Sequence, residues 1–381
     1  MILAEKTNFD FNGDDRGYLT HSLHPYPAKF PPQLPQKLLT LYAKQGEIIL
    51  DPFCGSGTTL IEAKLQGINA IGVDVNGLAC LLSKVKATVF QNTDYQEVIF
   101  FIEKIKNIII DIELGNVLTI KPKEIEGLNH WFQYNVSQEI TTILNEIDKL
   151  ENQDAKDFLK IVLSSIIVRV SNQESDTRFA AIDKKIVNGF TLNLFVNKTK
   201  EYLTRVMEFS EKITTQTTTK IFNADSRKLD FIESGSVDLI ITSPPYANTY
   251  DYYLYHKFRK RWLDLDVKFA QYNEIGSRRE FSSLKKAPEK WNKDLILCFL
   301  EMNRVLKPNG LAFIVIGDSV IKKNLIKIDE VIRSFSKEIG FDVIDIVSSD
   351  LAKHSRLFNP SFAQKGKQEH LITLRKKIET I

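Results

Sequence analysis

Residues 47–74 have the sequence EIILDPFCGSGTTLIEAKLQGINAIGVD, and this stretch decides the fold. Residues 47–51 form an apolar run typical of a buried strand, and a Gly-rich turn over residues 52–57 follows it. The segment 58–66 is typical of a helix that a glycine ends, and residues 69–74 form a second strand that ends in an acid. This order of strand, turn, helix and strand predicts the start of a doubly wound α/β sheet.

The same pattern returns in the second half of the chain. A helix is expected near residues 291–306, before a turn at 307–310. Apolar runs that predict further strands lie at residues 219–225, 237–242, 311–316, 340–347 and 369–375. The last two are placed to form an antiparallel hairpin at the edge of a mostly parallel sheet.

A long segment separates the second and third predicted strands. Residues 92–218 are far more than an ordinary connection in such a sheet requires. Apolar residues recur there at heptad-like spacing, as in Ile140, Ile143, Leu144 and Ile147. We therefore expect a mainly helical insert.

The motif Ser243-Pro244-Pro245-Tyr246 directly follows the strand at residues 237–242. The prolines must end that strand and hold the motif as a stiff rim. The Ser243 hydroxyl and a carbonyl of Ser243 or Pro244 can accept hydrogen bonds from one NH2 group, while the Tyr246 ring stacks on the plane that carries it. A Pro-rich turn with a purely structural role is the alternative.

Three acids follow three predicted strands. Asp51 precedes a turn whose glycines, Gly55 and Gly57, let the backbone approach a ligand closely. Asp74 is placed to accept from ribose hydroxyls, and Asp225 from an adenine amino group. A ligand with adenosine at one end and an ammonium and a sulfonium at the other satisfies all three acids, and S-adenosylmethionine is that molecule.

These residues resemble the motifs of the amino-group DNA methyltransferases, which methylate N4 of cytosine or N6 of adenine. The resemblance covers residues 21–90 and 219–375 and includes the upstream segment His24-Pro-Tyr-Pro-Ala-Lys-Phe30. It implies a seven-stranded, Rossmann-like methyltransferase sheet. It also implies S-adenosylmethionine as the cofactor and double-stranded DNA as the substrate, with the target base flipped out of the duplex.

The resemblance also implies roles for individual residues and segments. Residues 1–91 would form a cofactor-binding part, 92–218 a target-recognition or cap insert, and 219–381 the catalytic part with basic DNA-facing segments. The residues implied to bind the cofactor are Tyr26, Pro27, Ala28, Lys29, Phe30, Asp51, Pro52, Phe53, Gly55, Ser56, Gly57, Thr58, Thr59, Asp74, Val75, Asp225 and Ser226. The residues implied for catalysis are Ser243, Pro244, Pro245 and Tyr246.

Serine before Pro-Pro-Tyr resembles the cytosine-N4 members, and adenine N6 remains the alternative target. Methylation at C5 of cytosine would need a cysteine nucleophile. This chemistry is disfavoured, because Cys54 lies in the cofactor turn and Cys80 and Cys298 lie in predicted helices. Methylation of RNA or of a protein glutamine, and a catalytically silent DNA-binding subunit, are further alternatives. Both motifs are present, which favours an active enzyme.

The net charge of +3 is small, but positive charge gathers after the Pro-Pro-Tyr motif. Residues 249–295 hold 11 Lys and Arg against 7 Asp and Glu. Such a cluster beside the site favours a polyanionic substrate. The candidate DNA-binding residues are Lys257, Arg259, Lys260, Arg261, Arg278 and Arg279. An amphipathic helix whose Phe258 and Trp262 face the core is the alternative for residues 256–262.

Composition sets further expectations. The chain has 43% apolar and 26% charged residues, no apolar run long enough for a membrane span and no signal-like start, so we expect a cytoplasmic protein. No Cys or His spacing indicates a metal site. No nuclease-like cluster is evident, so a cognate restriction endonuclease would have to be a separate chain.

Overall fold

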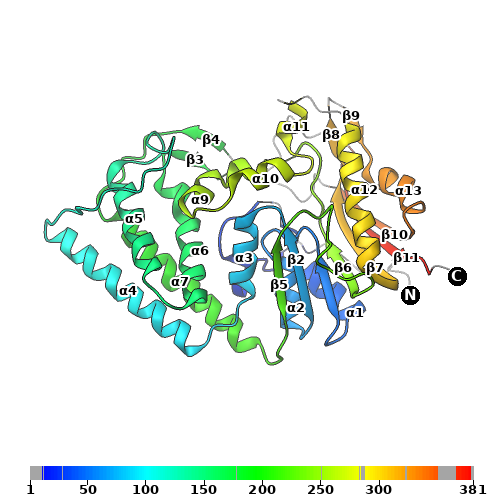
Figure 1. Ribbon diagram of the computed structural model, residues 1–381, viewed down its shortest axis with the longest axis horizontal. Coiled ribbons are helices and arrows are strands. Elements are labelled where there is room, and N and C mark those ends of the chain that lie inside the picture. The colour runs from blue at the N-terminus through cyan, green and yellow to red at the C-terminus, as the bar shows by residue number, and fades with distance from the viewer. Residues whose placement is uncertain are drawn as a thin grey trace.

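The computed structural model describes residues 11, 13–27, 29–176, 178–249, 251–282, 284, 288–321, 324–350 and 366–378. At its centre lies a seven-stranded sheet with the strand order β10-β11-β7-β6-β1-β2-β5 (Figure 1). The strands are β1 (Ile48–Asp51), β2 (Asn69–Asp74), β5 (Thr219–Asn223), β6 (Val237–Thr242), β7 (Leu306–Gly317), β10 (Phe341–Asp350) and β11 (Gln368–Lys376). β11 pairs antiparallel with both β10 and β7, and all the other pairings in this sheet are parallel, which confirms the predicted, mostly parallel fold with a C-terminal hairpin.

Alternate residues of the central strands point to opposite faces of the sheet, and each face has its own core. Ile49, Leu239 and Ile241 pack with α1 (Gln33–Tyr42) and α2 (Thr58–Leu65) on one face. Leu50 and Ile240 pack on the other face with α12 (Pro288–Val305) and α13 (Ile328–Ser336). Burial on both faces explains why these strands have continuous apolar sequences.

The insert lies beside the sheet and is mainly helical, as predicted (Figure 1). Its helices are α4 (Asn92–Glu113), α5 (Tyr134–Asp148), α6 (Gln153–Val170) and α7 (Phe190–Lys212), with a hairpin of β3 (Gln173–Ser175) and β4 (Arg178–Ala181). One core cluster joins these helices to α3 (Gly77–Ala87) and α9 (Lys257–Trp262), through residues such as Leu82, Phe158 and Trp262. The insert therefore shares a core with the rest of the protein.

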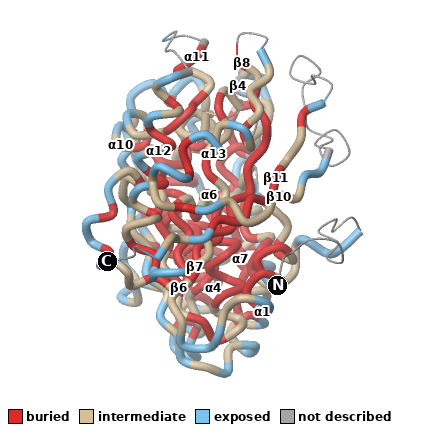
Figure 2. Tube along the Cα trace, turned by 90° about the vertical axis from the view of Figure 1, so that its right-hand side faces the viewer, coloured by how far each residue is buried: buried red, intermediate tan, exposed pale blue. Residues whose placement is uncertain are grey.

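Several short elements connect the larger ones. They are the 3-10 helix η1 (Leu19–Ser22), the helices α8 (Tyr252–Tyr255), α10 (Val267–Asn273) and α11 (Arg278–Ser282), and the hairpin β8 (Ser319–Ile321) with β9 (Asn324–Ile326). Figure 2 shows the buried residues concentrated in the interior and the exposed residues along the outside. No helix among the described residues is long and apolar enough to cross a membrane.

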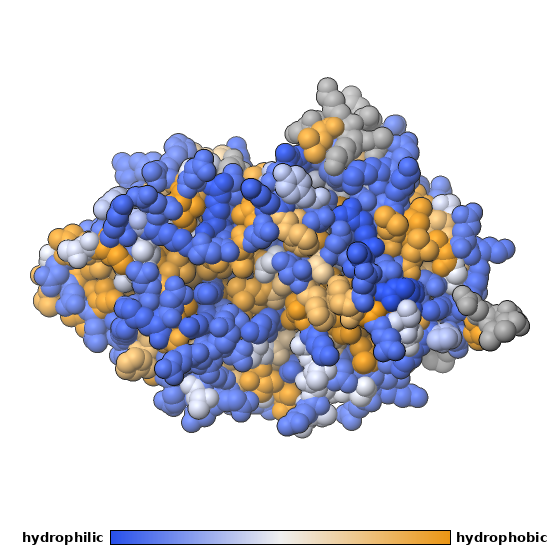
Figure 3. All heavy atoms as spheres, viewed as in Figure 1, coloured by the Kyte–Doolittle hydropathy of each residue, from blue (hydrophilic) through white to orange (hydrophobic). Residues whose placement is uncertain are grey.

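The space-filling view shows mostly hydrophilic atoms on this face, with hydrophobic atoms in several patches, one of them at its left end, over the end of α4 (Figure 3). Exposed apolar side chains in this part of the chain include Ile110, Leu114 and Val117. This end of the insert lies far from the sheet (Figure 1), so it does not contribute to the site at the sheet edge.

Parallel pairing brings the predicted acids to one edge of the sheet. Asp51 of β1 pairs with Gly72 of β2, and Asp74 pairs with Asn223 of β5. The carboxyl ends of these strands therefore meet, which is where open α/β sheets bind ligands.

Gly72 allows the turn after β1 to pack against β2. A Cβ atom at this position would lie 2.6 Å from Leu60 Cδ1 and 3.0 Å from Cys54 Sγ. We expect Gly72→Ala to lower the free energy of unfolding by about 1–3 kcal/mol, because the added methyl group overpacks a closed core. Urea denaturation measures this change.

Gly77→Ala is the matched control, since its Cβ would lie 3.4 Å from its nearest neighbour, Asn223 Oδ1, at the start of α3. Its unfolding free energy should change by less than about 0.5 kcal/mol. Equal effects of the two substitutions would contradict the packing role of Gly72.

Candidate active site

A cavity of about 410 Å3 lies at the carboxyl ends of the central strands, and most of the predicted site residues line it. The predicted residues in its wall are Tyr26, Lys29, Phe30, Asp51, Phe53, Gly55, Ser56, Thr58, Asp74, Val75, Asp225, Ser226, Ser243, Pro244, Pro245 and Tyr246. The structure therefore brings five segments of the sequence to one site. A cavity of this size and position is typical of small-molecule sites.

Four other predicted residues do not line the cavity. Pro52, Gly57 and Thr59 lie just behind the wall, and Pro27 lies in the upstream segment. Ala28 is outside the described residues. Gly57 has φ 84° and a Cβ there would lie 3.0 Å from Ser83, so this glycine shapes the turn rather than the cavity surface.

The glycine turn is fixed from both sides. The Gly55 nitrogen donates to Asp74 Oδ2 (2.9 Å), and the Gly55 carbonyl accepts from Ser83 Oγ (2.8 Å). Gly55 has φ 49°, and α2 begins directly after Gly57. The turn therefore presents backbone and the start of a helix to the cavity.

Asp51 is buried beneath the turn. Its Oδ1 atom accepts from Thr242 Oγ1 (2.6 Å) and from the Phe53 nitrogen (3.1 Å). Burial raises the pKa of Asp51 to about 6, although hydrogen bonds from Thr242, Thr59 and Phe53 lower it. An incoming cation would favour the ionised form.

Asp74 lies at the end of β2 and lines the cavity. Its second oxygen, Oδ1, accepts from the Asn76 nitrogen (2.8 Å). Burial raises the pKa of Asp74 to about 6, while backbone hydrogen bonds from Asn76 and Gly55 and the charge of Lys260 lower it. The carboxylate is thus held in one orientation towards the ligand space.

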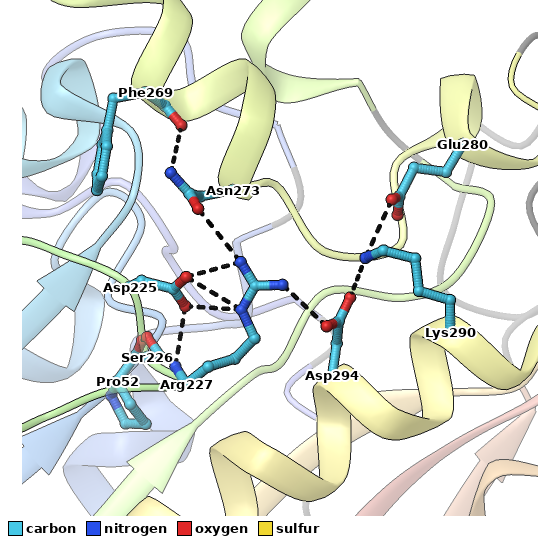
Figure 4. A network of polar contacts seen from close by, with 9 residues as sticks. All are labelled: Pro52, Asp225, Ser226, Arg227, Phe269, Asn273, Glu280, Lys290 and Asp294. Atoms are coloured by element: carbon cyan, nitrogen blue, oxygen red, sulfur yellow. Dashed lines mark hydrogen bonds and ion pairs between the residues drawn. The ribbon is translucent and has the colours of Figure 1, made fainter.

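Asp225 lies in a polar network (Figure 4). Its carboxylate accepts from Arg227 Nε (3.0 Å), and Arg227 also donates to Asp294 (2.8 Å) and Asn273 (3.3 Å). The network orients Asp225 but also occupies part of its accepting capacity. The adjacent Ser226 hydroxyl donates to the Pro52 carbonyl, which ties this strand end to the glycine turn.

Hydrogen bonds from neighbouring elements hold the Ser-Pro-Pro-Tyr motif in place. Trp291 Nε1 donates to the Pro245 carbonyl (3.3 Å), and the Asn248 nitrogen donates to the Gly276 carbonyl (2.9 Å). The Tyr246 hydroxyl donates to Glu369 Oε1 (2.7 Å). Burial, followed by the nearby Glu369 charge, raises the pKa of Tyr246 well above its ordinary value, so its hydroxyl is a donor.

Aromatic rings close the cavity beside the glycine turn. The Tyr26 ring stacks on His256 with centroids 5.0 Å apart and on Tyr252 with centroids 5.9 Å apart. Lys29 Nζ donates to the His21 carbonyl (3.0 Å), which fixes the upstream segment near the wall. Segments more than 200 residues apart in the sequence thus form one side of the site.

The candidate DNA-binding residues divide into two groups. Arg259 and Lys260 are 1% and 0% exposed. Arg259 donates to the Ser164 carbonyl and pairs with Asp176, both in the insert. These two side chains therefore point into the protein, which corrects their predicted DNA-facing placement.

Arg259 and Lys260 are buried because α9 is enclosed on several sides: Phe258, Arg259 and Lys260 follow one another around the helix, and all three are buried. Phe258 and Trp262 of the same helix are also buried in the core that the insert shares. Lys257 and Arg261 remain half-buried on this helix. The other two candidates, Arg278 and Arg279, are half-buried on α11.

Several cavity residues were not predicted from the sequence. They include Cys54, Asn76, Thr249, Tyr252, Tyr253, Asn273, Glu274 and Glu369. The aromatic run at Tyr252 and Tyr253 follows the motif closely and was a usable signal. Glu274 and Glu369 lie far along the chain and reach the cavity only through tertiary packing.

One group of described residues has metal-ligating atoms within 4.8 Å of one another, namely Asp318, Asp329 and His370. Asp318 Oδ1 accepts from the Ile328 nitrogen (3.0 Å) and lies 3.2 Å from His370 Nε2. Its Oδ2 accepts from the Gln368 nitrogen (3.1 Å). These hydrogen bonds account for the buried carboxylate as a structural link between the ends of β7, α13 and β11.

The chain is similar in sequence to known DNA methylases. A family model described as DNA methylase matches residues 5–85 and 237–377. Type II methyltransferase M.MjaII of Methanocaldococcus jannaschii is 26% identical over 403 residues, covering 81% of this chain and 73% of that protein. Type II methyltransferase M.MvaI of Kocuria varians is 26% identical over 376 residues, covering 84% and 81%.

A solved structure from Thermus thermophilus, described as a putative DNA modification methylase complexed with S-adenosylmethionine, is 20% identical, with a TM-score of 0.26. The similarity covers 41% of this chain and 52% of that chain. The family model matches the two parts of the chain that hold most of the cavity residues and leaves out residues 86–236, which contain the insert and the cavity residues Asp225 and Ser226. Because the family model matches more than half of the sequence, the chain belongs to the DNA methylase family, whose methyl donor is S-adenosylmethionine.

Proposed function

We propose that this protein is a site-specific DNA methyltransferase that moves a methyl group from S-adenosylmethionine to the exocyclic N4 amine of a flipped cytosine. The observation that carries the proposal is the meeting of the glycine turn and the Ser-Pro-Pro-Tyr motif in one cavity. Its relatives M.MjaII and M.MvaI are named type II methyltransferases, which supports a role in a restriction-modification or similar host-marking system. A cognate endonuclease would be a separate chain.

In this proposal the cofactor lies along the strand ends. Asp51 and the glycine turn hold the methionine part, Asp74 accepts from the ribose hydroxyls, and Asp225 accepts from the adenine amine. The fixed orientation of Asp74 supports this assignment, since both its oxygens are already held by backbone donors. Lys29 and Phe30 cover the cofactor from the upstream segment.

The target amine would lie at the part of the cavity wall that the Ser-Pro-Pro-Tyr motif forms. Its lone pair is delocalised into the ring, which makes it a poor nucleophile. Hydrogen bonds from the amine to the Ser243 hydroxyl and the Pro244 carbonyl favour a tetrahedral nitrogen and direct its lone pair at the methyl group. Stacking on Tyr246 holds the flipped base.

The transfer itself is a direct displacement. The nitrogen lone pair forms the new bond to the methyl carbon, and the electrons of the carbon–sulfur bond remain on sulfur. The nitrogen is then cationic and acidic, so its proton leaves after the methyl group has moved. The neutral serine hydroxyl matches a pyrimidine amine, and adenine N6 is the alternative target.

The rim of the cavity supports DNA binding. Arg279 lies over the Tyr253 ring, with the guanidinium carbon 5.8 Å from the ring centroid, and Tyr253 lines the cavity. Arg278 and Arg279 therefore lie beside the point where a flipped base would enter. Phosphate contacts from such residues fix the register of the duplex.

The raised pKa values of the cofactor acids predict a pH dependence. Asp51 and Asp74 both have a pKa of about 6, and their ionised forms attract the cationic cofactor. As the pH falls through about 6, protonation removes this attraction, so Kd for S-adenosylmethionine should rise by up to about tenfold per pH unit for each acid involved. Calorimetric titration between pH about 7.5 and about 5 measures it.

Asp74→Asn should weaken binding at neutral pH and flatten the pH dependence, because only Asp51 then titrates. Asp230→Asn is the control, since Asp230 is a surface residue paired with Lys228. A wild-type Kd that stays constant across this pH range would contradict the assignment.

Ser243→Ala tests the catalytic motif. We expect methyl transfer to DNA to fall about 100-fold because one acceptor of the target amine is lost, while cofactor affinity stays within about twofold. Transfer of labelled methyl groups measures the rate, and Ser334→Ala, on the exposed side of α13, is the control.

Mass spectrometry of nucleosides from the methylated DNA identifies the product. N4-methylcytosine supports the proposal, whereas N6-methyladenine would establish the alternative target. If neither modified nucleoside appears in DNA that was incubated with folded, cofactor-binding protein, the proposed DNA methyltransferase function is overturned.

Arg278→Ala and Arg279→Ala should weaken binding to duplexes of any sequence. Each lost phosphate contact should also reduce the slope of log K against log salt by about 1. Fluorescence anisotropy at several salt concentrations gives both quantities. Lys121→Ala, on the exposed surface of the insert, should leave them unchanged; an equal loss there would show that the arginines contribute only general charge.

A further inference from the structure

The carboxylate of Glu369 lies in the wall of the same cavity as the Ser-Pro-Pro-Tyr motif. Glu369 belongs to β11, which is hydrogen-bonded on both sides and pairs through this residue with Gly317 of β7 and Ser349 of β10. An interior strand holds its side chains more rigidly than a loop does. Glu369 is thus a fixed charge in the part of the cavity proposed for the target base.

The contacts of Glu369 lead directly to the motif. Glu369 Oε1 accepts from the Tyr246 hydroxyl at 2.7 Å. The Ser243 hydroxyl also lies within hydrogen-bonding reach of the Tyr246 hydroxyl. Among the described residues, Tyr246 is the one hydrogen-bond partner of this carboxylate, so the Oε2 atom keeps its accepting capacity.

The residues on either side of Glu369 are locked in place. The Gln368 nitrogen donates to Asp318 Oδ2 (3.1 Å). His370 lies 3.2 Å from Asp318 Oδ1 through Nε2 and 2.8 Å from Ser348 Oγ through Nδ1. These bonds orient the backbone from which Glu369 projects.

The chemistry of methyl transfer gives this carboxylate a role. Positive charge leaves the sulfonium and appears on the target nitrogen during the reaction. A carboxylate accepts hydrogen bonds only, so it suits a donor that is becoming a cation. A fixed negative charge aimed at developing positive charge stabilises the transition state more than the ground state.

We propose that Glu369 is a further catalytic residue, whose carboxylate stabilises the charge developing on the target amine and accepts the proton that the methylated nitrogen releases. This inference depends on the proposed function. The methyl carbon–nitrogen bond forms as the carbon–sulfur bond breaks, and the nitrogen–hydrogen electron pair returns to nitrogen as its proton moves to Glu369. The proton then passes to solvent, which restores the carboxylate.

Glu369→Gln tests the charge with little change of shape. In single-turnover experiments with saturating cofactor and DNA, we expect methyl transfer to slow about 100-fold. Affinity for S-adenosylmethionine should stay within about threefold, since the carboxylate lies outside the proposed cofactor wall. A transfer rate within about threefold of wild type would overturn the proposal.

Tyr246→Phe separates direct action from action through the tyrosine. If Glu369 acts on the amine itself, Glu369→Gln slows the reaction further in the Tyr246→Phe background. If Glu369 only orients Tyr246, the double variant is no slower than Tyr246→Phe alone, and the proposal fails.

Glu369→Asp keeps the charge and should retain more activity than Glu369→Gln, which tests the role even if the glutamine variant is less stable. Glu338→Gln, an exposed carboxyl after α13, is the matched control and should not change the rate. Wild-type protein that transfers no methyl group to any DNA would instead reject the proposed function, and this inference with it.

Discussion

The hydrogen bond from the Gly55 nitrogen to Asp74 Oδ2 is the constraint on which the site depends. It joins the turn after β1 to the end of β2, so the shape of the turn and the orientation of the acid are set together. In the parallel pairing of β1 with β2, Asp51 lies opposite Gly72. This register places the end of β2 within hydrogen-bonding distance of the turn that follows β1. Thr242, at the end of β6, lies at the same edge, and its hydroxyl donates a hydrogen bond to Asp51.

Much of this arrangement could be predicted from the sequence because its signals are local. The helix α2 lies within the predicted segment 58–66, and β2 has the bounds predicted from its sequence, residues 69–74. Acids directly after strands mark the site because parallel strands share an edge. The backbone conformations of the glycine turn and of the Ser-Pro-Pro-Tyr motif depend mainly on the glycines and prolines within each motif.

The remainder could not be predicted because it depends on contacts between distant segments. Glu369 reaches the cavity only because β11 pairs beside β7, and no local pattern marks it. Arg259 and Lys260 belong to a run that is basic in sequence, yet both are buried because α9 is enclosed on several sides by the insert and the neighbouring elements. Charge counted along a sequence does not reveal which side of a short helix meets solvent.

The shared core between the insert and α9 limits how this protein could be shortened or recombined. The insert occupies one continuous stretch of sequence, yet Asp176 supplies the counter-charge for Arg259, and Phe158 packs in the same cluster as Trp262. Excising the insert would remove the Ser164 and Asp176 partners of Arg259 and would expose an apolar surface behind the segment that follows Tyr246. Either defect costs several kcal/mol. Exchange of this segment between relatives therefore requires exchange of α9 as well.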